Sequence, residues 1–247
     1  MGIKDDFVLG EGIYFLNHSV GRPLRSSQQA LQDAFMAPWE DGAPGIWPKW
    51  LEIIDGFQDA LAGLFQAKKE DFCPQANLSS GLTKLVMALP QLQTHKGIVL
   101  MSEIDFPTVG FVLQQALPNG RDQIRFIPKE LDVTDPNVWS DYLTSDVSAV
   151  FLSHAYSNTG QQAPLGEIVP LAAERSILTM IDVAQSAGVI PLNFSELNPD
   201  FVLGTSVKWL CGGPGAGYLW VNPDRIDECE PKDVGWFSSI RSGFTHK

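Results

Sequence analysis

Short apolar runs alternate with segments of helical periodicity along most of the chain after its first third. Six runs bounded by turn residues predict buried strands at residues 97–102, 123–128, 147–153, 177–182, 200–206 and 217–221. Helical spacing is found at residues 107–117, 135–143 and 164–176. This alternation predicts an α/β domain with a mostly parallel sheet and helices on both faces.

The first third of the chain has a different pattern, dominated by one amphipathic segment at residues 48–67. Pro48 suits the start of a helix. One helical stripe carries the apolar residues Trp50, Ile53, Ile54, Phe57, Leu61, Leu64 and Phe65. We expect this helix to pack against the sheet domain or against a partner subunit.

Length and charge narrow the class of protein. At 247 residues and 44% hydrophobic, the chain can build one large domain, or a domain plus part of another. Its net charge of -12 repels nucleic acid and anionic lipid, and its 17 Lys and Arg residues are scattered singly along the chain. We therefore expect a small-molecule ligand and neither a nucleic-acid nor a membrane partner.

Neither a membrane span nor a disulfide framework is predicted. The apolar runs are far shorter than the roughly 20 residues of a spanning helix, and the N-terminus lacks a charged-then-apolar leader. Cys73, Cys211 and Cys229 have no CxxC spacing and leave an odd thiol, which fits a reducing compartment and gives no sign of a zinc site. We expect a cytoplasmic protein.

Polar residues follow several of the predicted strands at their carboxyl ends, where open α/β sheets bind ligands. Asp182 closes one strand, Lys208 comes just after another, and Ser153 ends a third. Because a buried carboxylate needs a partner, Asp182 and Lys208 could form a structural ion pair. Alternatively, they could belong to a preformed cofactor site. Their spacing leaves both possibilities open.

Pyridoxal phosphate (PLP) needs four features from a protein. A lysine amine forms a Schiff base and moves protons at the substrate's α-carbon. A carboxylate keeps the pyridine nitrogen protonated, with a Coulomb gain of about 4 kcal/mol at roughly 4 Å and an effective dielectric of roughly 20. Amides and hydroxyls at a helix N-terminus hold the phosphate, and an aromatic ring covers one face of the cofactor.

Candidates for the two remaining features lie upstream of the acid and the lysine. Asn77, Ser79 and Ser80 stand at the start of a helical pattern, where they could bind an anion or simply cap the helix. Phe106 and Thr108 follow a strand, where the phenylalanine could cover a cofactor or be a core residue before a proline turn. Each signal is weak alone, but all four in this order at strand ends favour PLP.

Five blocks of the chain resemble a known family in the right order. They are "DFPT", "SHAYSNTGQ", "DVAQSAG", "SVKWLCGGPGAGYLWV" and "VGWF". The chain resembles fold-type I PLP enzymes of the class V aminotransferase group, most closely kynureninase, from about Phe15 to Phe237. The opening "FLNHSVGRP" resembles the substrate-side N-terminal segment of these enzymes. The resemblance implies PLP as cofactor, an amino-acid substrate and a homodimer.

The resemblance also implies roles for particular residues. Lys208 would be the Schiff-base lysine and Asp182 the partner of the pyridine nitrogen. Leu78, through its backbone, and Ser79 would hold the phosphate, and Phe106 would stack on the ring. The remaining implied residues are Thr108 and Ser153 lining the pocket, Gln185 at the ring oxygen, and Trp236 reaching a phosphate across the dimer.

Departures from the kynureninase pattern leave the reaction open. Val207 replaces a tyrosine phosphate ligand, Tyr156 and Asn158 replace an asparagine and a basic residue, and Gln185 stands where kynureninases have histidine. Transamination, desulfuration and epimerisation are therefore alternatives to kynureninase-like hydrolysis. In that hydrolysis Lys208 removes the α-proton, water attacks the side-chain carbonyl, and the Cβ–Cγ bond breaks to give alanine and an anthranilate-like product.

The glycine run at residues 212–217 follows the lysine and leads into a strand, whereas a dinucleotide fingerprint must open a helix. An NAD-binding Rossmann protein is accordingly disfavoured. We expect these glycines to let the backbone turn sharply beside the cofactor, with a plain tight turn as the alternative.

The expected organisation is an N-terminal segment at 1–47, a PLP-binding large domain at 48–237 and a divergent tail at 238–247. Family members continue into a small C-terminal domain that holds the arginine for the substrate carboxylate. We expect that domain to be missing from this chain and the chain to be a fragment. A non-catalytic module that binds the cofactor or another subunit is thus a further alternative.

Overall fold

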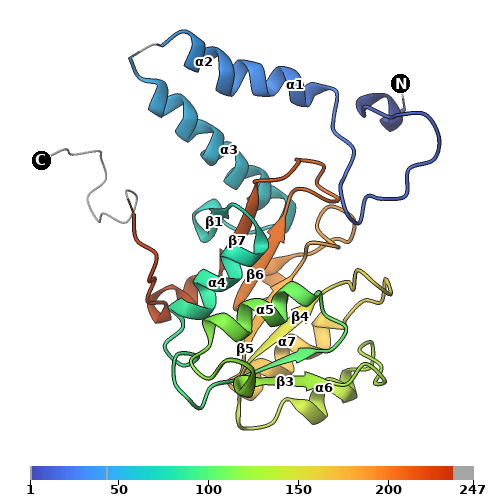
Figure 1. The fold of residues 1–247 in the computed structure, drawn as a ribbon, viewed down its shortest axis with the longest axis vertical. Coiled ribbons are helices and arrows are strands. Elements are labelled where there is room, and N and C mark those ends of the chain that lie inside the picture. The colour runs from blue at the N-terminus through green and yellow to red at the C-terminus, as the bar shows by residue number, and fades with distance from the viewer. Residues whose placement is uncertain (1, 43, 236–247) are drawn as a thin grey trace, which may run out of the picture.

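A computed structural model describes residues 2–42 and 44–235, and its centre is one seven-stranded sheet (Figure 1). The strand order is β1-β7-β6-β5-β4-β2-β3. The strands are β1 (Phe72–Gln75), β2 (Ile98–Ser102), β3 (Ile124–Ile127), β4 (Val147–Ser153), β5 (Leu178–Asp182), β6 (Phe201–Thr205) and β7 (Gly217–Val221). Strands β3, β2, β4, β5 and β6 are parallel, and β7 pairs antiparallel with both β6 and β1.

All six predicted strands are confirmed, with small changes at their ends, and the mostly parallel sheet is confirmed as well. Strand β1 was not predicted. Its four residues include Pro74, and proline is confined to strand edges because it cannot donate a ladder hydrogen bond. β1 is an edge strand, so a proline is tolerated there.

Helices cover both faces of the sheet. One face packs against α4 (Leu78–Ala88) and α5 (Pro107–Ala116). The other packs against α6 (Pro136–Tyr142), α7 (Leu165–Glu174), α8 (Phe194–Leu197) and the C-terminal half of α3 (Ile46–Phe65). The three predicted helices after the first third correspond to α5, α6 and α7, and are confirmed.

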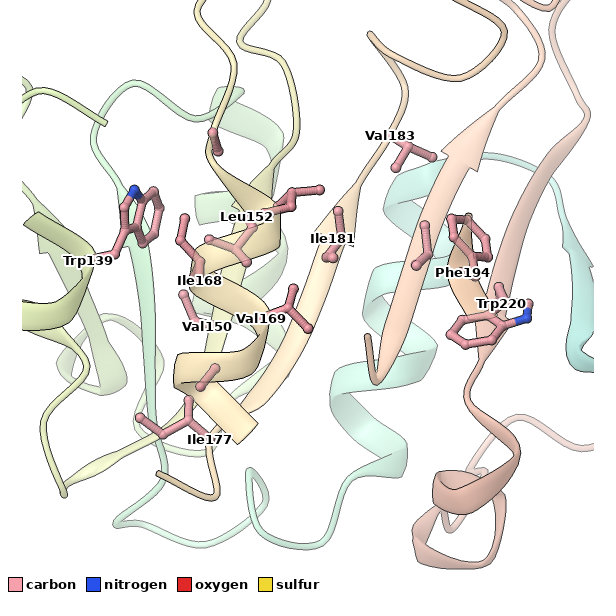
Figure 2. Packing of buried hydrophobic residues seen from close by; sticks show 14 of the residues in the cluster. Trp139, Val150, Leu152, Ile168, Val169, Ile177, Ile181, Val183, Phe194 and Trp220 are labelled. Carbon is pink, nitrogen blue, oxygen red and sulfur yellow. The ribbon is translucent and has the colours of Figure 1, made fainter. Parts of the chain in front are cut away.

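Successive residues of β4 serve opposite faces. Val150 and Leu152 belong to the cluster that contains Trp139 of α6 and Ile168 of α7, as Figure 2 shows. Ala149 and Phe151 belong to the cluster beneath α4 and α5. Because side chains alternate across a strand, a sheet covered on both sides needs the continuous apolar run that the sequence displays.

The N-terminal helices form an arm that projects beyond one end of the sheet (Figure 1). The arm contains α1 (Ser26–Leu31), the π-helical η2 (Gln32–Met36), α2 (Ala37–Glu40) and the first half of α3. Short 3-10 helices elsewhere are η1 (Ile3–Asp6), η3 (Lys69–Asp71), η4 (Gly120–Gln123) and η5 (Pro223–Glu228).

Only two of the seven residues of the predicted apolar stripe of α3 are buried. Leu61 and Phe65 lie in the core, whereas Ile53 and Ile54 are each 41% exposed. The helix also begins at Ile46, two residues before the predicted start at Pro48. The expected packing against the sheet therefore holds for the C-terminal half of α3, and its N-terminal half joins the arm. No helix within the described ranges is long and apolar enough to cross a membrane.

Candidate functional site

The carboxyl ends of the parallel strands bring the predicted polar residues to one edge of the sheet. Ser153 and Asp182 are the last residues of β4 and β5 and are direct partners in the register of these strands. Lys208 follows the end of the neighbouring strand β6 at Thr205. The structure thus assembles the acid, the lysine and the serine from three adjacent strands.

Asp182 keeps one carboxylate oxygen available. Its Oδ1 accepts a hydrogen bond of 2.7 Å from the Ala184 amide, and Oδ2 has no donor among the described residues. Burial raises the pKa of Asp182, and the hydrogen bond from Ala184 and the charge of Lys208 act against that rise. The partly buried Oδ2 atom of Asp182 is therefore suited to accept a hydrogen bond from an N–H group of a ligand.

Lys208 and Asp182 influence each other without joining in an ion pair. Burial lowers the pKa of Lys208, and the negative charge of Asp182 opposes that change. None of the ion pairs among residues 2–42 and 44–235 includes either residue. The structural ion pair considered from the sequence is therefore not formed, and the Lys208 amine is available.

Phe106 faces the lysine. The Nζ atom of Lys208 lies 5.7 Å from the centre of the Phe106 ring, and that ring is 52% exposed. A core role for Phe106 is thereby excluded, because a core phenylalanine is almost fully covered. Thr108 lies in the first turn of α5, immediately beyond, and is partly buried.

The N-terminus of α4 has the features of an anion site. Asn77 caps the helix through Oδ1, which accepts a 2.9 Å hydrogen bond from the Ser80 amide. The amides of Leu78 and Ser79 donate to no acceptor among the described residues, as expected for the first turn of a helix. A Cβ on Gly217 would lie 3.0 Å from Asn77 Cα, so this glycine lets β7 approach the helix end closely. The capping and anion-binding interpretations of this segment are compatible.

The N-terminal segment lies against the backbone that carries Lys208. The Gly21 amide donates a 2.8 Å hydrogen bond to the carbonyl oxygen of Val207. Gln185 donates through Nε2 to the carbonyl oxygen of His18 at 2.9 Å, and its Oε1 accepts a 3.0 Å bond from Trp209 Nε1. The sequence had not indicated Gly21 or Trp209, and the only signal for the first was the resemblance of the segment that contains it.

Asp105 is a second buried carboxylate at the same edge and was not predicted. It is 5% exposed and accepts hydrogen bonds from the Ser102 amide at 2.8 Å and from Ser153 Oγ at 2.6 Å. Burial, more than any other cause, raises the pKa of Asp105 to about 7, and the charge of Asp182 adds to the rise. In the sequence, the position of Asp105 between a strand end and a proline turn was the one available sign of a buried acid. That sign is weak, because acids in such positions are common on protein surfaces.

The glycine run forms the turn between β6 and β7. Gly213 and Gly215 have φ angles of 73° and 98°, which few other residues adopt. A Cβ on Gly212 would lie 2.8 Å from the Ser206 side chain. The sharp turn after the lysine is confirmed. Trp236 lies outside the described residues, so its predicted contact stays a prediction.

These groups match the needs of PLP. Asp182 Oδ2 can accept from a pyridine N–H, the Lys208 amine forms no ion pair with the described residues, and the first amides of α4 can receive a phosphate. The half-exposed ring of Phe106 can cover one face of the cofactor. The residues present therefore fit this cofactor.

Curated relatives agree in sequence along nearly the whole chain. The kynureninase of Pseudomonas fluorescens is 26% identical over 251 residues, covering 97% of this chain and 58% of the relative. The kynureninase of Burkholderia mallei (strain SAVP1) is 24% identical and is matched over 95% of this chain and 58% of its own length. The chain thus spans less than two thirds of these relatives.

Solved structures agree in fold. A mutant of C-DES with glycine covalently linked to its PLP cofactor has a TM-score of 0.86 and 26% identity, covering 96% of this chain and 63% of its own. The complex of the cystine C–S lyase C-DES with its reaction product cysteine persulfide has a TM-score of 0.82 and 27% identity. This match covers 90% of this chain and 60% of the C-DES chain. The apo cysteine desulfurase of Thermococcus onnurineus NA1 shares the fold, with a TM-score of 0.76 at 18% identity over 91% of this chain and 57% of its own.

The sequence profile of the family described as aminotransferase class-V matches residues 53–240. That range contains β1 to β7, the acid and lysine at the strand ends, and the helix terminus suited to phosphate. It leaves out α1, α2 and the segment that lies against the Lys208 loop. On this match across most of its length, the chain belongs to the aminotransferase class-V family.

Proposed function

We propose that this chain binds PLP through Lys208 and forms the cofactor-binding part of an enzyme that acts on an amino acid. The observation that carries the proposal is the placement of Asp182 at the end of β5 and of Lys208 just after the end of β6, with neither residue in an ion pair among the described residues. The PLP-linked structure of C-DES, at 26% identity, supports it.

Bound PLP supplies an electron sink for charge that develops at the α-carbon of an amino acid. The role of the protein is to hold the cofactor and to move protons. Asp182 Oδ2 would accept a hydrogen bond from the ring nitrogen and would stabilise its positive charge. Because burial lowers the pKa of Lys208, more of its amine is neutral near pH 7, and Nζ can take a proton from the α-carbon and return it. The first turn of α4 would hold the phosphate, and Ser79 would add a hydroxyl there.

For the reaction itself, we propose kynureninase-like hydrolysis of a C–C bond in the substrate side chain. The match to kynureninases over 97% of this chain supports this choice. Cysteine desulfuration or cystine lysis is the second candidate, because C-DES has the highest TM-score of the structures described above. Incubation with kynurenine, cysteine, cystine and ordinary amino acids separates these reactions. Anthranilate release supports the first, and sulfide or persulfide release contradicts it.

Borohydride reduction followed by mass spectrometry tests the cofactor assignment. The protein incubated with PLP should gain one reducible adduct, on the peptide that contains Lys208, and Lys208→Ala should lack it. An adduct that persists in this variant, or that forms on another lysine, contradicts the assignment. A normal adduct without turnover of any amino acid supports the alternative of a non-catalytic cofactor-binding module.

We also propose a homodimer formed through the N-terminal arm. Phe35, Trp39, Trp47 and Trp50 pack against one another there, and Trp39 and Trp47 remain 57% and 44% exposed. Such a cluster is typical of an interaction surface. The cytoplasmic location and the division at residues 47 and 237 stay predictions.

A further inference from the structure

Asp105 is buried beside the proposed cofactor site but has no role in the chemistry described so far. It stands in the turn between β2 and α5, directly before Phe106, and it is 5% exposed. No ion pair among the described residues includes it, so both of its strong contacts are hydrogen bonds. Burying a carboxylate without a cation lowers the stability of the folded protein, so the presence of Asp105 at this position calls for an explanation.

The two hydrogen bonds of Asp105 join strand ends that the sheet itself leaves apart. The paired register of β2 and β4 runs from Ile98 with Val147 to Leu100 with Val150. Ser102 and Ser153 lie beyond these pairs, at the carboxyl ends of the two strands. Asp105 accepts from the Ser102 amide at 2.8 Å and from Ser153 Oγ at 2.6 Å. The Asp105 side chain thereby links the ends of β2 and β4 beyond the point where their backbone pairing stops.

This link sets the direction of the chain that carries Phe106. The Asp105 amide donates to the Ser102 carbonyl oxygen at 3.1 Å, which closes the turn, and α5 begins one residue after Phe106. The Phe106 ring in turn lies 5.7 Å from Lys208 Nζ. A displaced Asp105 would therefore move the aromatic face of the site relative to the lysine.

Four groups face Asp105 from the surrounding elements. The Ser102 amide and the Ser153 hydroxyl donate hydrogen bonds to it, and the charge of Asp182 repels its charge. The fourth group is Tyr156, whose pKa is raised mainly by burial and further by the charge of Asp105. Native Asp105 consequently holds its proton at a higher pH than the unfolded chain does, up to a pKa of about 7. Between pH 3.8 and about 7 this residue makes the folded state less stable as the pH rises.

We propose that Asp105 is a positioning residue that ties the β2–α5 turn to the end of β4, and so holds Phe106 and Ser153 in place around the cofactor. The cofactor part of this inference rests on the proposed function. The link between the strands is a property of the chain alone and can be measured without PLP.

The test compares Asp105→Asn, Asp105→Ala and Ser153→Ala with Asp132→Ala as a matched control. Asp132 also accepts hydrogen bonds within a turn, from the amide and hydroxyl of Thr134 at 2.9 and 2.7 Å, but it is exposed. Asparagine preserves the shape of Asp105 without its charge: its side-chain oxygen can accept from the Ser102 amide, and its NH2 group can donate to Ser153 Oγ, which reverses the direction of that bond. Alanine removes both bonds, and Ser153→Ala removes one.

Hydrogen exchange of the protein without cofactor is the first readout. We expect faster exchange in peptides covering residues 102–106 and 151–154 for Asp105→Ala, a smaller increase for Ser153→Ala, and wild-type exchange for Asp105→Asn and Asp132→Ala. Unchanged exchange in Asp105→Ala overturns the proposal. Equal loss in Asp105→Asn and Asp105→Ala also overturns it, because the negative charge would then matter more than the hydrogen bonds.

PLP affinity, measured by quenching of tryptophan fluorescence, is the second readout. Asp105→Ala should bind PLP about tenfold more weakly, because Phe106 and Ser153 are no longer held in place around the cofactor, and Asp105→Asn should restore the affinity. Rescue of the affinity by the uncharged Asp105→Asn would assign the loss in Asp105→Ala to the two hydrogen bonds and not to the negative charge of Asp105. A wild-type protein without a borohydride adduct at Lys208 contradicts the proposed function, and the exchange experiment still decides the role of Asp105.

Discussion

Gly21 lies directly against the backbone of Lys208, although the two residues come from opposite ends of the chain. A Cβ atom at Gly21 would stand 1.9 Å from the Lys208 carbonyl oxygen and 2.8 Å from Cys211 Sγ. The Gly21 amide also bonds to the Val207 carbonyl oxygen at 2.8 Å. The N-terminal segment therefore supports the loop that presents the lysine, and glycine is the residue that allows this contact.

Replacing Gly21 by alanine should force the segment off the Lys208 loop. A contact of 1.9 Å with backbone cannot be absorbed by a side-chain movement, so we expect a loss of about 1–3 kcal/mol in the free energy of unfolding, as for other overpacked sites. Urea denaturation measures this loss. Gly10→Ala is the control, since its Cβ would meet only Arg22 at 3.7 Å. Equal stability of the two variants would show that the segment is not seated on the loop.

Neutral His154 should make stability depend on pH below neutrality. Burial lowers its pKa from 6.5 to about 4, so the unfolded state binds more protons over that interval. The contribution of His154 is complete above pH 6.5 and is lost as the pH falls toward 4. His154→Asn should flatten this part of the stability curve, measured by urea denaturation at several pH values. The exposed His95→Asn serves as control, and an equal flattening there contradicts the assignment to His154.

The first turn of α4 should bind phosphate through its free amides. Ser79→Glu places a carboxylate where the anion would sit, and we expect PLP and inorganic phosphate to bind at least about tenfold more weakly because like charges repel. Isothermal titration calorimetry measures both affinities. Thr83→Glu, one turn later on the same helix, is the matched control. Unchanged phosphate binding in Ser79→Glu would place the anion elsewhere.

Removing Asn77 as the helix cap should reduce stability without introducing charge. Its side chain satisfies the Ser80 amide at 2.9 Å, and loss of such a cap costs about 1 kcal/mol. Asn77→Ala should therefore shift the urea midpoint downward, whereas Asn77→Asp should retain it. If both variants lose the same stability, the hydrogen bond to Ser80 is not the reason.

The aromatic arm should mediate self-association. Trp39→Ser combined with Trp47→Ser should lower the apparent mass in analytical ultracentrifugation while leaving the thermal midpoint nearly unchanged, because both side chains are largely exposed. Phe111→Ser, which removes a 67% exposed ring from α5, is the control. A dimer that survives the double substitution and dissociates in the control would move the interface away from the arm.

Much of the fold could be predicted because local patterns report burial. The apolar run at Val147–Ser153 has the length and continuity of a strand covered on both faces, and β4 occupies those residues. The sequence also predicted Asp182 and Lys208 at strand ends. In the structure Asp182 ends β5 and Lys208 follows the end of β6. β1 was not predicted because it is only four residues long, contains Pro74 and, among the described residues, pairs with β7 alone.

The linear sequence determined the parallel sheet, the helix layers and the identity of the residues at the strand ends, because hydrophobic period and strand punctuation are properties of neighbouring residues. Tertiary structure alone decided that Asp182 and Lys208 avoid an ion pair, that Asp105 joins β2 to β4, and that Gly21 lies on the Lys208 loop. Contacts between distant segments depend on how strands are ordered and how closely backbones approach. No local pattern encodes that geometry.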